Sequence, residues 1–145
     1  MENPISEVGP TETWDGLRSN KDTVLVDVRT HAEWSFVGLP DLSELGKEPL
    51  LNQWATLPGM QQNTSFLSDL DSQLDGAAPS KIYFLCRSGI RSLSAAHLVS
   101  EAFAARGQSV ECINIIGGFE GDLNQDRHRG NMNGWKKNGL PWRQS

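Results

Sequence analysis

Apolar runs along the chain predict the strands of a sheet. The runs at 24–28 and 81–85 are apolar at nearly every position, which is typical of strands buried on both faces of a parallel sheet. The segments 5–8 and 110–116, in which apolar residues are mixed with polar ones, predict two further strands. Thr11 follows the first of them and is expected to cap a helix.

Helices are predicted where apolar residues recur every three or four positions. This spacing covers 66–74 and 95–103, and Gly76 and Gly107 follow as expected after helix C-termini. Thr30-His31-Ala32-Glu33 has the spacing of a capping box, so a short helix is expected to begin there. Strands that alternate with helices indicate an α/β fold.

Two segments give weaker patterns. Residues 37–63 are rich in glycine, proline and polar side chains, but Leu50, Leu51 and Trp54 fit one helical face, so we expect a short helix or lid there. A final short helix is expected over 132–138.

Length and composition describe one globular domain, over residues 1–145, with 37% hydrophobic and 21% charged residues. The net charge of −5 argues against nucleic-acid binding, which depends on clustered cations. Met1-Glu2-Asn3-Pro4 has no basic or apolar targeting pattern, and no apolar run is long enough to span a membrane. We therefore expect a cytoplasmic protein. The two cysteines do not make a disulfide framework.

Cys86 is the candidate nucleophile. It directly follows the run at 81–85 and precedes a polar, glycine-containing loop, an arrangement that places a reactive group at the carboxyl end of a strand. An ordinary thiol, with a pKa of about 8.5, is only a few per cent ionised at neutral pH and needs activation. Arg87 and Arg91 supply positive charge, and the backbone of Ser88-Gly89-Ile90 can form an anion-binding nest at a helix start.

The spacing of the arginines narrows the chemistry. Phosphatases that use a cysteine nucleophile carry an arginine six positions after it, where this chain has Ser92, and the second arginine here is Arg91. The loop is therefore one residue tighter. A tighter loop suits a sulfur atom carried on Cys86 better than a phosphate.

The segment Cys86-Arg87-Ser88-Gly89-Ile90-Arg91-Ser92 resembles the active-site loop of the single-domain rhodanese family of sulfurtransferases. The segment 24–34, with its Asp-Val-Arg followed by Glu and Trp, resembles that family's second signature, and a Gly-Gly-Phe-Glu segment at 117–120 adds to the likeness. The resemblance implies an α/β, rhodanese-like three-layer sandwich, with a central, mainly parallel sheet and helices on both faces. It also implies a cysteine that forms a persulfide.

Supporting roles are expected for three charged residues. Asp27 lies in a buried run, where a charge is costly unless it is paired, and Arg29 or a loop amide is the expected partner. Glu33 is expected to cap its helix or to bind Arg29. Cys112 is interpreted as structural, with a sulfur-relaying role left open. The histidines are scattered without metal-ligand spacing.

The sequence thus predicts a sulfurtransferase that works by double displacement. Cys86 takes the outer sulfur of thiosulfate or a similar small anionic donor and passes it to a thiol or cyanide, with a protein acceptor left open. No metal or cofactor is expected. The residues expected to bind the donor and hold the persulfide are Arg87, Ser88, Gly89, Ile90, Arg91 and Ser92.

Two alternatives stay open. One is a non-catalytic rhodanese-fold module that binds a partner or senses redox state. The other, with weaker support, is a cysteine-dependent phosphatase or arsenate reductase on the same fold.

Overall fold

The computed structural model describes residues 5–144, so Ser145 and the amino-terminal segment Met1-Glu2-Asn3-Pro4 lie outside the described residues. Its centre is a five-stranded sheet in the order β1-β8-β7-β2-β4, with every neighbouring pair parallel. The strands are β1 Ser6–Val8, β2 Thr23–Asp27, β4 Leu50–Leu51, β7 Lys81–Leu85 and β8 Glu111–Ile115.

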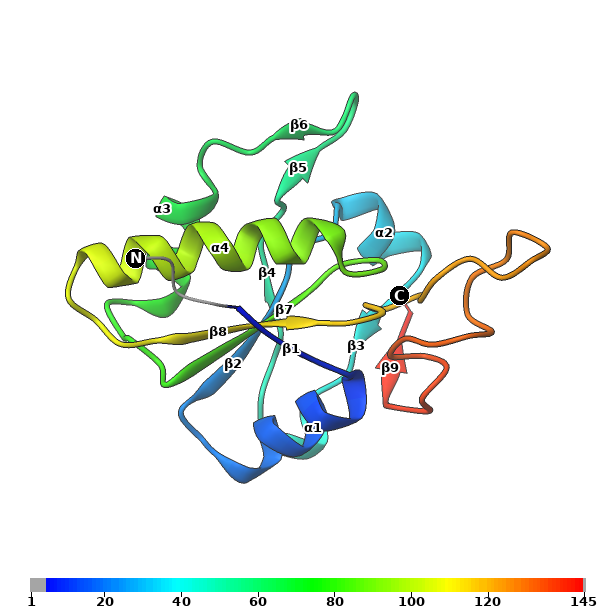
Figure 1. Ribbon diagram of the computed structural model, residues 1–145, viewed down its shortest axis with the longest axis horizontal. Helices are drawn as coiled ribbons and strands as arrows, with labels where there is room; N and C mark the ends of the chain where they lie inside the picture. Colours follow the sequence, from blue (N-terminus) through cyan, green and yellow to red (C-terminus); the bar gives the residue numbers. More distant parts are fainter. Residues whose placement is uncertain (1–4, 145) are drawn as a thin grey trace.

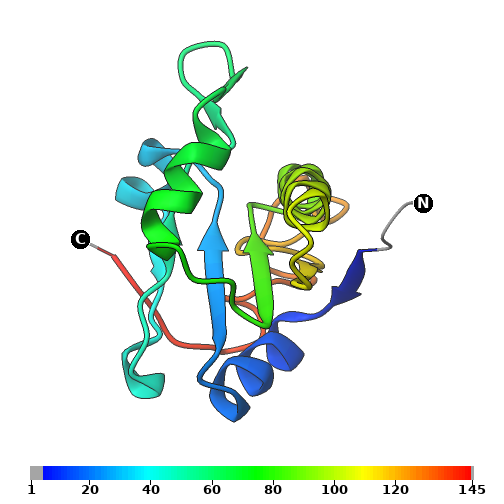
Figure 2. The ribbon, with the colours of Figure 1, turned by 90° about the vertical axis from the view of Figure 1, so that its left-hand side faces the viewer.

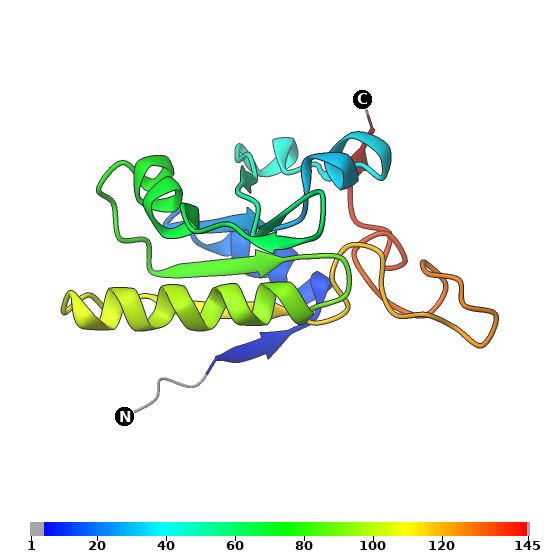
Figure 3. The same cartoon turned by 90° about the horizontal axis from the view of Figure 1, so that it is seen from above.

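Helices cover both faces of the sheet, as predicted. Figures 1 and 2 show α1 (Pro10–Ser19) on one face and α3 (Phe66–Leu74) and α4 (Ile90–Ala105) on the other. Helix α2 (His31–Phe36) lies beyond the carboxyl end of β2. Seen from above, α4 runs along the sheet, and the loop after β8 extends past the same end of the strands as α2 (Figure 3).

Side chains that alternate between the two faces of the sheet form two hydrophobic cores. Leu25 and Tyr83 pack with Trp14 of α1, while Val26 and Phe84 pack with the helices α3 and α4 on the opposite face. Successive side chains of a strand point to opposite faces, so a strand buried on both faces must be apolar throughout. This explains the apolar runs that predicted β2 and β7.

The segment 37–63 differs from the prediction. Leu50 and Leu51 do not form a helix but form the edge strand β4, in register with Val26 and Asp27. The remainder contains β3 (Leu39–Pro40), the 3₁₀ turn η1 (Ser43–Leu45), and the hairpin of β5 (Ala55–Thr56) with β6 (Gln61–Gln62). Pairing with a distant strand leaves no local periodicity, so such a short strand escapes pattern analysis.

The carboxyl-terminal prediction is also wrong. Residues 132–138 form turns rather than a helix. Trp135 is buried there, and its N–H donates to the Gly118 carbonyl at 2.8 Å. The chain then ends in β9 (Trp142–Arg143), which pairs antiparallel with β3.

The predicted helix ends are mostly confirmed. The capping box of α2 is present, and Gly76 and Gly107 follow α3 and α4 with φ of 77° and 72°. Thr11 as an N-cap is wrong, because α1 begins at Pro10, whose missing N–H costs nothing in a first turn. Among the helices of residues 5–144, none has the length and apolar composition needed to cross a bilayer.

Candidate active site

The loop that carries Cys86 connects β7 to α4. Cys86 comes directly after β7, and α4 begins at Ile90 with Gly89 as its N-cap. Gly89 has a φ of 116°, which residues with a side chain rarely adopt. In this conformation its N–H donates a hydrogen bond to Cys86 Sγ at 3.1 Å. The sulfur therefore lies at the positive end of a 16-residue helix and accepts from one backbone donor.

The segment after β8 packs against this loop. The Phe119 N–H donates to the Cys86 carbonyl at 2.8 Å, and the Glu120 N–H donates to the Arg87 carbonyl at 3.0 Å. A side chain on Gly118 would place its Cβ 2.5 Å from the Cys86 carbonyl oxygen, so this approach requires glycine. The Gly-Gly-Phe-Glu segment thus holds the backbone of the Cys86 loop through hydrogen bonds.

Cys86 is more enclosed than a freely accessible nucleophile. The residue is 1% exposed, and its Sγ lies 3.2 Å from Ser92 Oγ on the first turn of α4. In this conformation the sulfur offers almost no surface to solvent.

Arg91 does not stand free beside the sulfur but forms a two-pronged ion pair. Its Nη1 and Nη2 lie 2.8 and 2.9 Å from the two carboxylate oxygens of Glu33, and each side chain is 18% exposed. Glu33 also accepts from the Thr30 N–H in the capping box. The expected capping role is therefore confirmed, whereas the alternative pairing of Glu33 with Arg29 is wrong.

The pair is electrostatically coupled. Burial acts to raise the pKa of Glu33, but the hydrogen bonds and charge of Arg91, together with the hydrogen bonds from Thr30, outweigh it, so the pKa lies below its usual range. Burial acts to lower the pKa of Arg91, and Glu33 again outweighs it and leaves a raised pKa. Both groups are charged at neutral pH and clamp α2 to the Cys86 loop.

The other residues of the loop face outward. Arg87 is exposed, and its side chain makes no hydrogen bond or ion pair within residues 5–144. Ser88 is half-buried, and Ile90 is 78% exposed. Of the two loop arginines, Arg87 is the one whose guanidinium is available to an incoming anion.

The predicted pair of Asp27 and Arg29 is confirmed. Both side chains are fully buried, and Arg29 Nη2 lies 2.7 Å from Asp27 Oδ2. The same nitrogen donates to the Gly38 carbonyl, and the guanidinium carbon lies 4.2 Å from the centroid of the Phe119 ring. Because Phe119 contacts the Cys86 carbonyl, Arg29 acts on the loop as a positioning residue.

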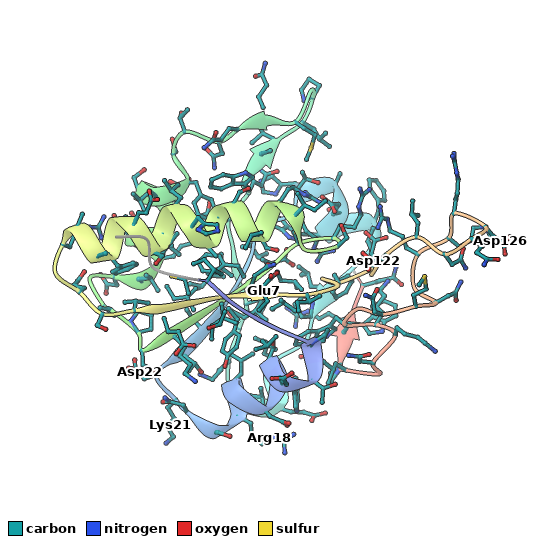
Figure 4. The ribbon with its side chains drawn as sticks, viewed as in Figure 1. Glu7, Arg18, Lys21, Asp22, Asp122 and Asp126 are labelled. Atoms are coloured by element: carbon teal, nitrogen blue, oxygen red, sulfur yellow. The ribbon has the colours of Figure 1, made fainter. Side chains whose placement is uncertain are left out.

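Sequence reasoning missed two residues behind Ser92. Ser92 Oγ donates to Asn114 Oδ1 at 2.6 Å, and Asn114 Nδ2 donates to Glu7 Oε2 at 2.9 Å. Figure 4 shows Glu7 on the edge strand β1, next to β8. The available signal was Asn114 itself, because an amide inside a buried strand needs hydrogen-bond partners.

Cys112 lies in different surroundings. It belongs to β8, is 3% exposed, and burial together with the Glu111 charge raises its pKa to about 12. Such a thiol is protonated at neutral pH, which agrees with the structural interpretation. Within residues 5–144, no three His, Cys, Asp or Glu side chains gather as metal ligands.

Comparison with known proteins identifies close relatives. No family model matches the chain. The uncharacterized RP600 homolog of Rickettsia rickettsii is 38% identical over 138 residues, covering 95% of this chain and 97% of the relative. Uncharacterized protein RP600 of Rickettsia prowazekii (strain Madrid E) is 37% identical over 138 residues.

Two solved structures are also similar to this chain. The crystal structure of Rv0390 from M. tuberculosis matches with a TM-score of 0.84 and 41% identity, covering 99% of this chain and 100% of that one. A rhodanese-like domain protein from Staphylococcus aureus matches with a TM-score of 0.48 and 21% identity, covering 79% of this chain and 87% of that one. The chain therefore belongs to the family that includes the uncharacterized Rickettsia protein RP600 and its homologs and Rv0390.

Proposed function

We propose that this chain is a rhodanese-type sulfurtransferase that moves sulfane sulfur from thiosulfate or a similar donor to a thiophilic acceptor. The observation that carries the proposal is the position of Cys86. Its sulfur stands at the carboxyl end of β7 and the positive end of α4, and accepts the Gly89 N–H. These features favour a sulfur anion, which a nucleophilic cysteine requires.

The reaction proceeds in two displacements. The Cys86 thiol first loses its proton to solvent, and the thiolate attacks the outer sulfur of thiosulfate. The sulfur–sulfur bond of the donor breaks, sulfite leaves with the bonding electron pair, and Cys86 carries a persulfide. An acceptor thiolate then attacks the outer sulfur of the persulfide and becomes a persulfide itself, which regenerates the Cys86 thiolate.

The loop residues have separate tasks in this scheme. Arg87 attracts the anionic donor, because its guanidinium is exposed and has no partner within residues 5–144. The Gly89 N–H stabilises the sulfur anion, in the manner of an oxyanion hole. Arg91 pairs with Glu33 and so holds the Cys86 loop against α2.

Mass spectrometry after thiosulfate treatment tests the proposal. The wild-type protein and Cys112→Ala are expected to gain about 32 Da, one sulfur atom, and Cys86→Ala is expected to gain nothing. Turnover with cyanide is expected to fall by about 10³-fold or more in Cys86→Ala alone. A persulfide that persists without Cys86, or its absence from the wild type, would overturn the proposal.

A second candidate function is a module that binds a partner or senses redox state without turnover. The enclosure of Cys86 and the engagement of Arg91 by Glu33 favour it. This module predicts no mass gain with any sulfane donor. Hydrolysis of an aryl phosphate that is lost in Cys86→Ser would instead point to the phosphatase alternative.

A further inference from the structure

A chain of hydrogen bonds leads from Cys86 to the edge of the sheet. Cys86 Sγ lies 3.2 Å from Ser92 Oγ, Ser92 Oγ lies 2.6 Å from Asn114 Oδ1, and Asn114 Nδ2 lies 2.9 Å from Glu7 Oε2. Ser92 and Asn114 are almost fully buried, so no bulk water replaces a missing partner. The direction of each bond therefore matters.

The orientation of the Asn114 amide is fixed by its acceptors. Its Nδ2 donates both to Glu7 Oε2 and to the Gly89 carbonyl, at 2.9 and 3.1 Å. A flipped amide would direct its oxygen at a carboxylate oxygen and a backbone carbonyl oxygen, which are both acceptors. Asn114 Oδ1 consequently faces Ser92.

This orientation determines where the single hydroxyl proton of Ser92 goes. Because Asn114 Oδ1 can only accept, Ser92 donates its proton to it and presents lone pairs to Cys86. A Cys86 thiol fits this arrangement by donating its S–H to Ser92. A thiolate keeps the Gly89 N–H donor but loses the hydrogen bond with Ser92, because two groups of lone pairs would then face each other.

Other charges near the sulfur act in addition to this chain. Arg91 is close enough for the charges of Cys86 and Glu33 to act on it, and Asp27, paired with Arg29, acts on Arg91 as well. None of them contacts Ser92 through a hydrogen bond within residues 5–144, so they do not decide its hydroxyl direction.

We propose that Asn114 and Glu7 are positioning residues that hold Cys86 as a thiol at rest, by directing the Ser92 hydroxyl proton away from the sulfur. Thiolate or persulfide formation then requires this hydroxyl to turn toward Cys86 and leave Asn114 Oδ1. The proposal goes beyond the proposed function, because thiolate formation is measured with no sulfur donor present.

Thiolate ultraviolet absorbance followed against pH tests this proposal in the Cys112→Ala background, where Cys86 is the sole cysteine. Asn114→Leu removes the acceptor at similar volume, so the hydroxyl is free to donate to the sulfur. The Cys86 thiolate fraction at pH about 7 is expected to rise about tenfold, equivalent to about 1.4 kcal/mol. Asn114→Asp keeps the acceptor and adds a negative charge, and no rise is expected.

The Ser92→Ala background separates hydroxyl direction from general loosening. There, Asn114→Leu is expected to change nothing, because no hydroxyl remains. A rise that persists without Ser92, or no rise with Ser92 present, would overturn the proposal.

Glu7 provides a second test on the exposed strand β1, where substitution is least disruptive to the core. Glu7→Ala loosens the Asn114 amide and is expected to raise the thiolate fraction by about two- to threefold. Glu7→Gln keeps an acceptor oxygen for Asn114 and is expected to match the wild type. Equal values for Glu7→Ala and Glu7→Gln would contradict the role of Glu7, even if Asn114→Leu could not be purified folded.

Discussion

Cys86 and Cys112 come from neighbouring strands of one sheet, Cys86 just after β7 and Cys112 inside β8, and both belong to one apolar cluster. The two residues are 1% and 3% exposed. Cys112 lies within β8, opposite Ile82 of β7, where the backbone amides form the hydrogen bonds between the strands. Cys86 lies just past the end of β7, where the Gly89 N–H is free to point at its sulfur.

Burial alone does not decide what a thiol does. Burial without donors raises the pKa of Cys112 to about 12 and makes it inert. A sulfur at the end of a strand has a helix N-terminus and unpaired amides within reach. Position relative to the sheet ladder therefore separates the two residues more than exposure does.

The largest effect is expected from the buried ion pair of Asp27 and Arg29, which supports the Cys86 loop. Asp27→Asn leaves the buried Arg29 without its counter-charge, so the free energy of unfolding should fall by about 3 to 5 kcal/mol. Urea denaturation measures the loss. The exposed pair of Arg18 and Asp15 is the matched control, and Asp15→Asn should cost less than about 1 kcal/mol. Equal losses would contradict the structural role of the buried pair.

The raised pKa of Cys112 is tested by the stability of the protein at alkaline pH. The unfolded thiol ionises near pH 9, whereas in the folded protein the pKa of Cys112 is raised to about 12. The folded state therefore holds more protons between these values, and stability should fall as pH rises, by about 1.4 kcal/mol per pH unit from this group.

Denaturation at a series of pH values from about 9 to 11 isolates this contribution. Tyr83, whose pKa is raised by burial and nearby carboxylates, affects wild type and variant alike. Cys112→Ala should therefore show the shallower slope. Parallel slopes would mean that Cys112 is not held protonated.

The Gly89 N–H is the hydrogen-bond donor that distinguishes Cys86 from Cys112, and substitution of Gly89 tests it. Gly89→Ala forces a side chain onto a φ of 116° and should displace the N–H from the sulfur, so persulfide formation should slow by about 10²-fold. Gly107→Ala, just past the far end of α4, meets no atom within 4 Å and also forces a side chain onto a positive φ, of 72°. Rapid-quench measurement at saturating thiosulfate should show slowing in Gly89→Ala only, and similar rates would remove Gly89 from the site.

Local features of this molecule could be predicted from sequence, and distant pairings could not. The β7 strand end, the capping box at Thr30 and the pair of Asp27 with Arg29 each lie within a few residues. The partners Arg91 and Glu33 are 58 positions apart, and Asn114 and Glu7 are 107 apart. Charge and polarity mark such residues as needing partners, but only the folded sheet decides which ones.

The smallest effect concerns access to Cys86 from solvent. Arg87 is exposed and its side chain has no partner within residues 5–144, so Arg87→Gln should leave folding unchanged and weaken attraction of the donor. The KM for thiosulfate should rise about tenfold, equivalent to about 1.4 kcal/mol, with kcat nearly constant. Arg18, labelled at the lower edge of Figure 4, is another exposed arginine, and Arg18→Gln on α1 should leave KM unaltered. A high-salt series should reduce the difference between wild type and Arg87→Gln, because an exposed cation is screened. A fall in kcat with constant KM would instead assign Arg87 to the reaction step, and the two cysteines would then differ in catalytic charge as well as in backbone donors.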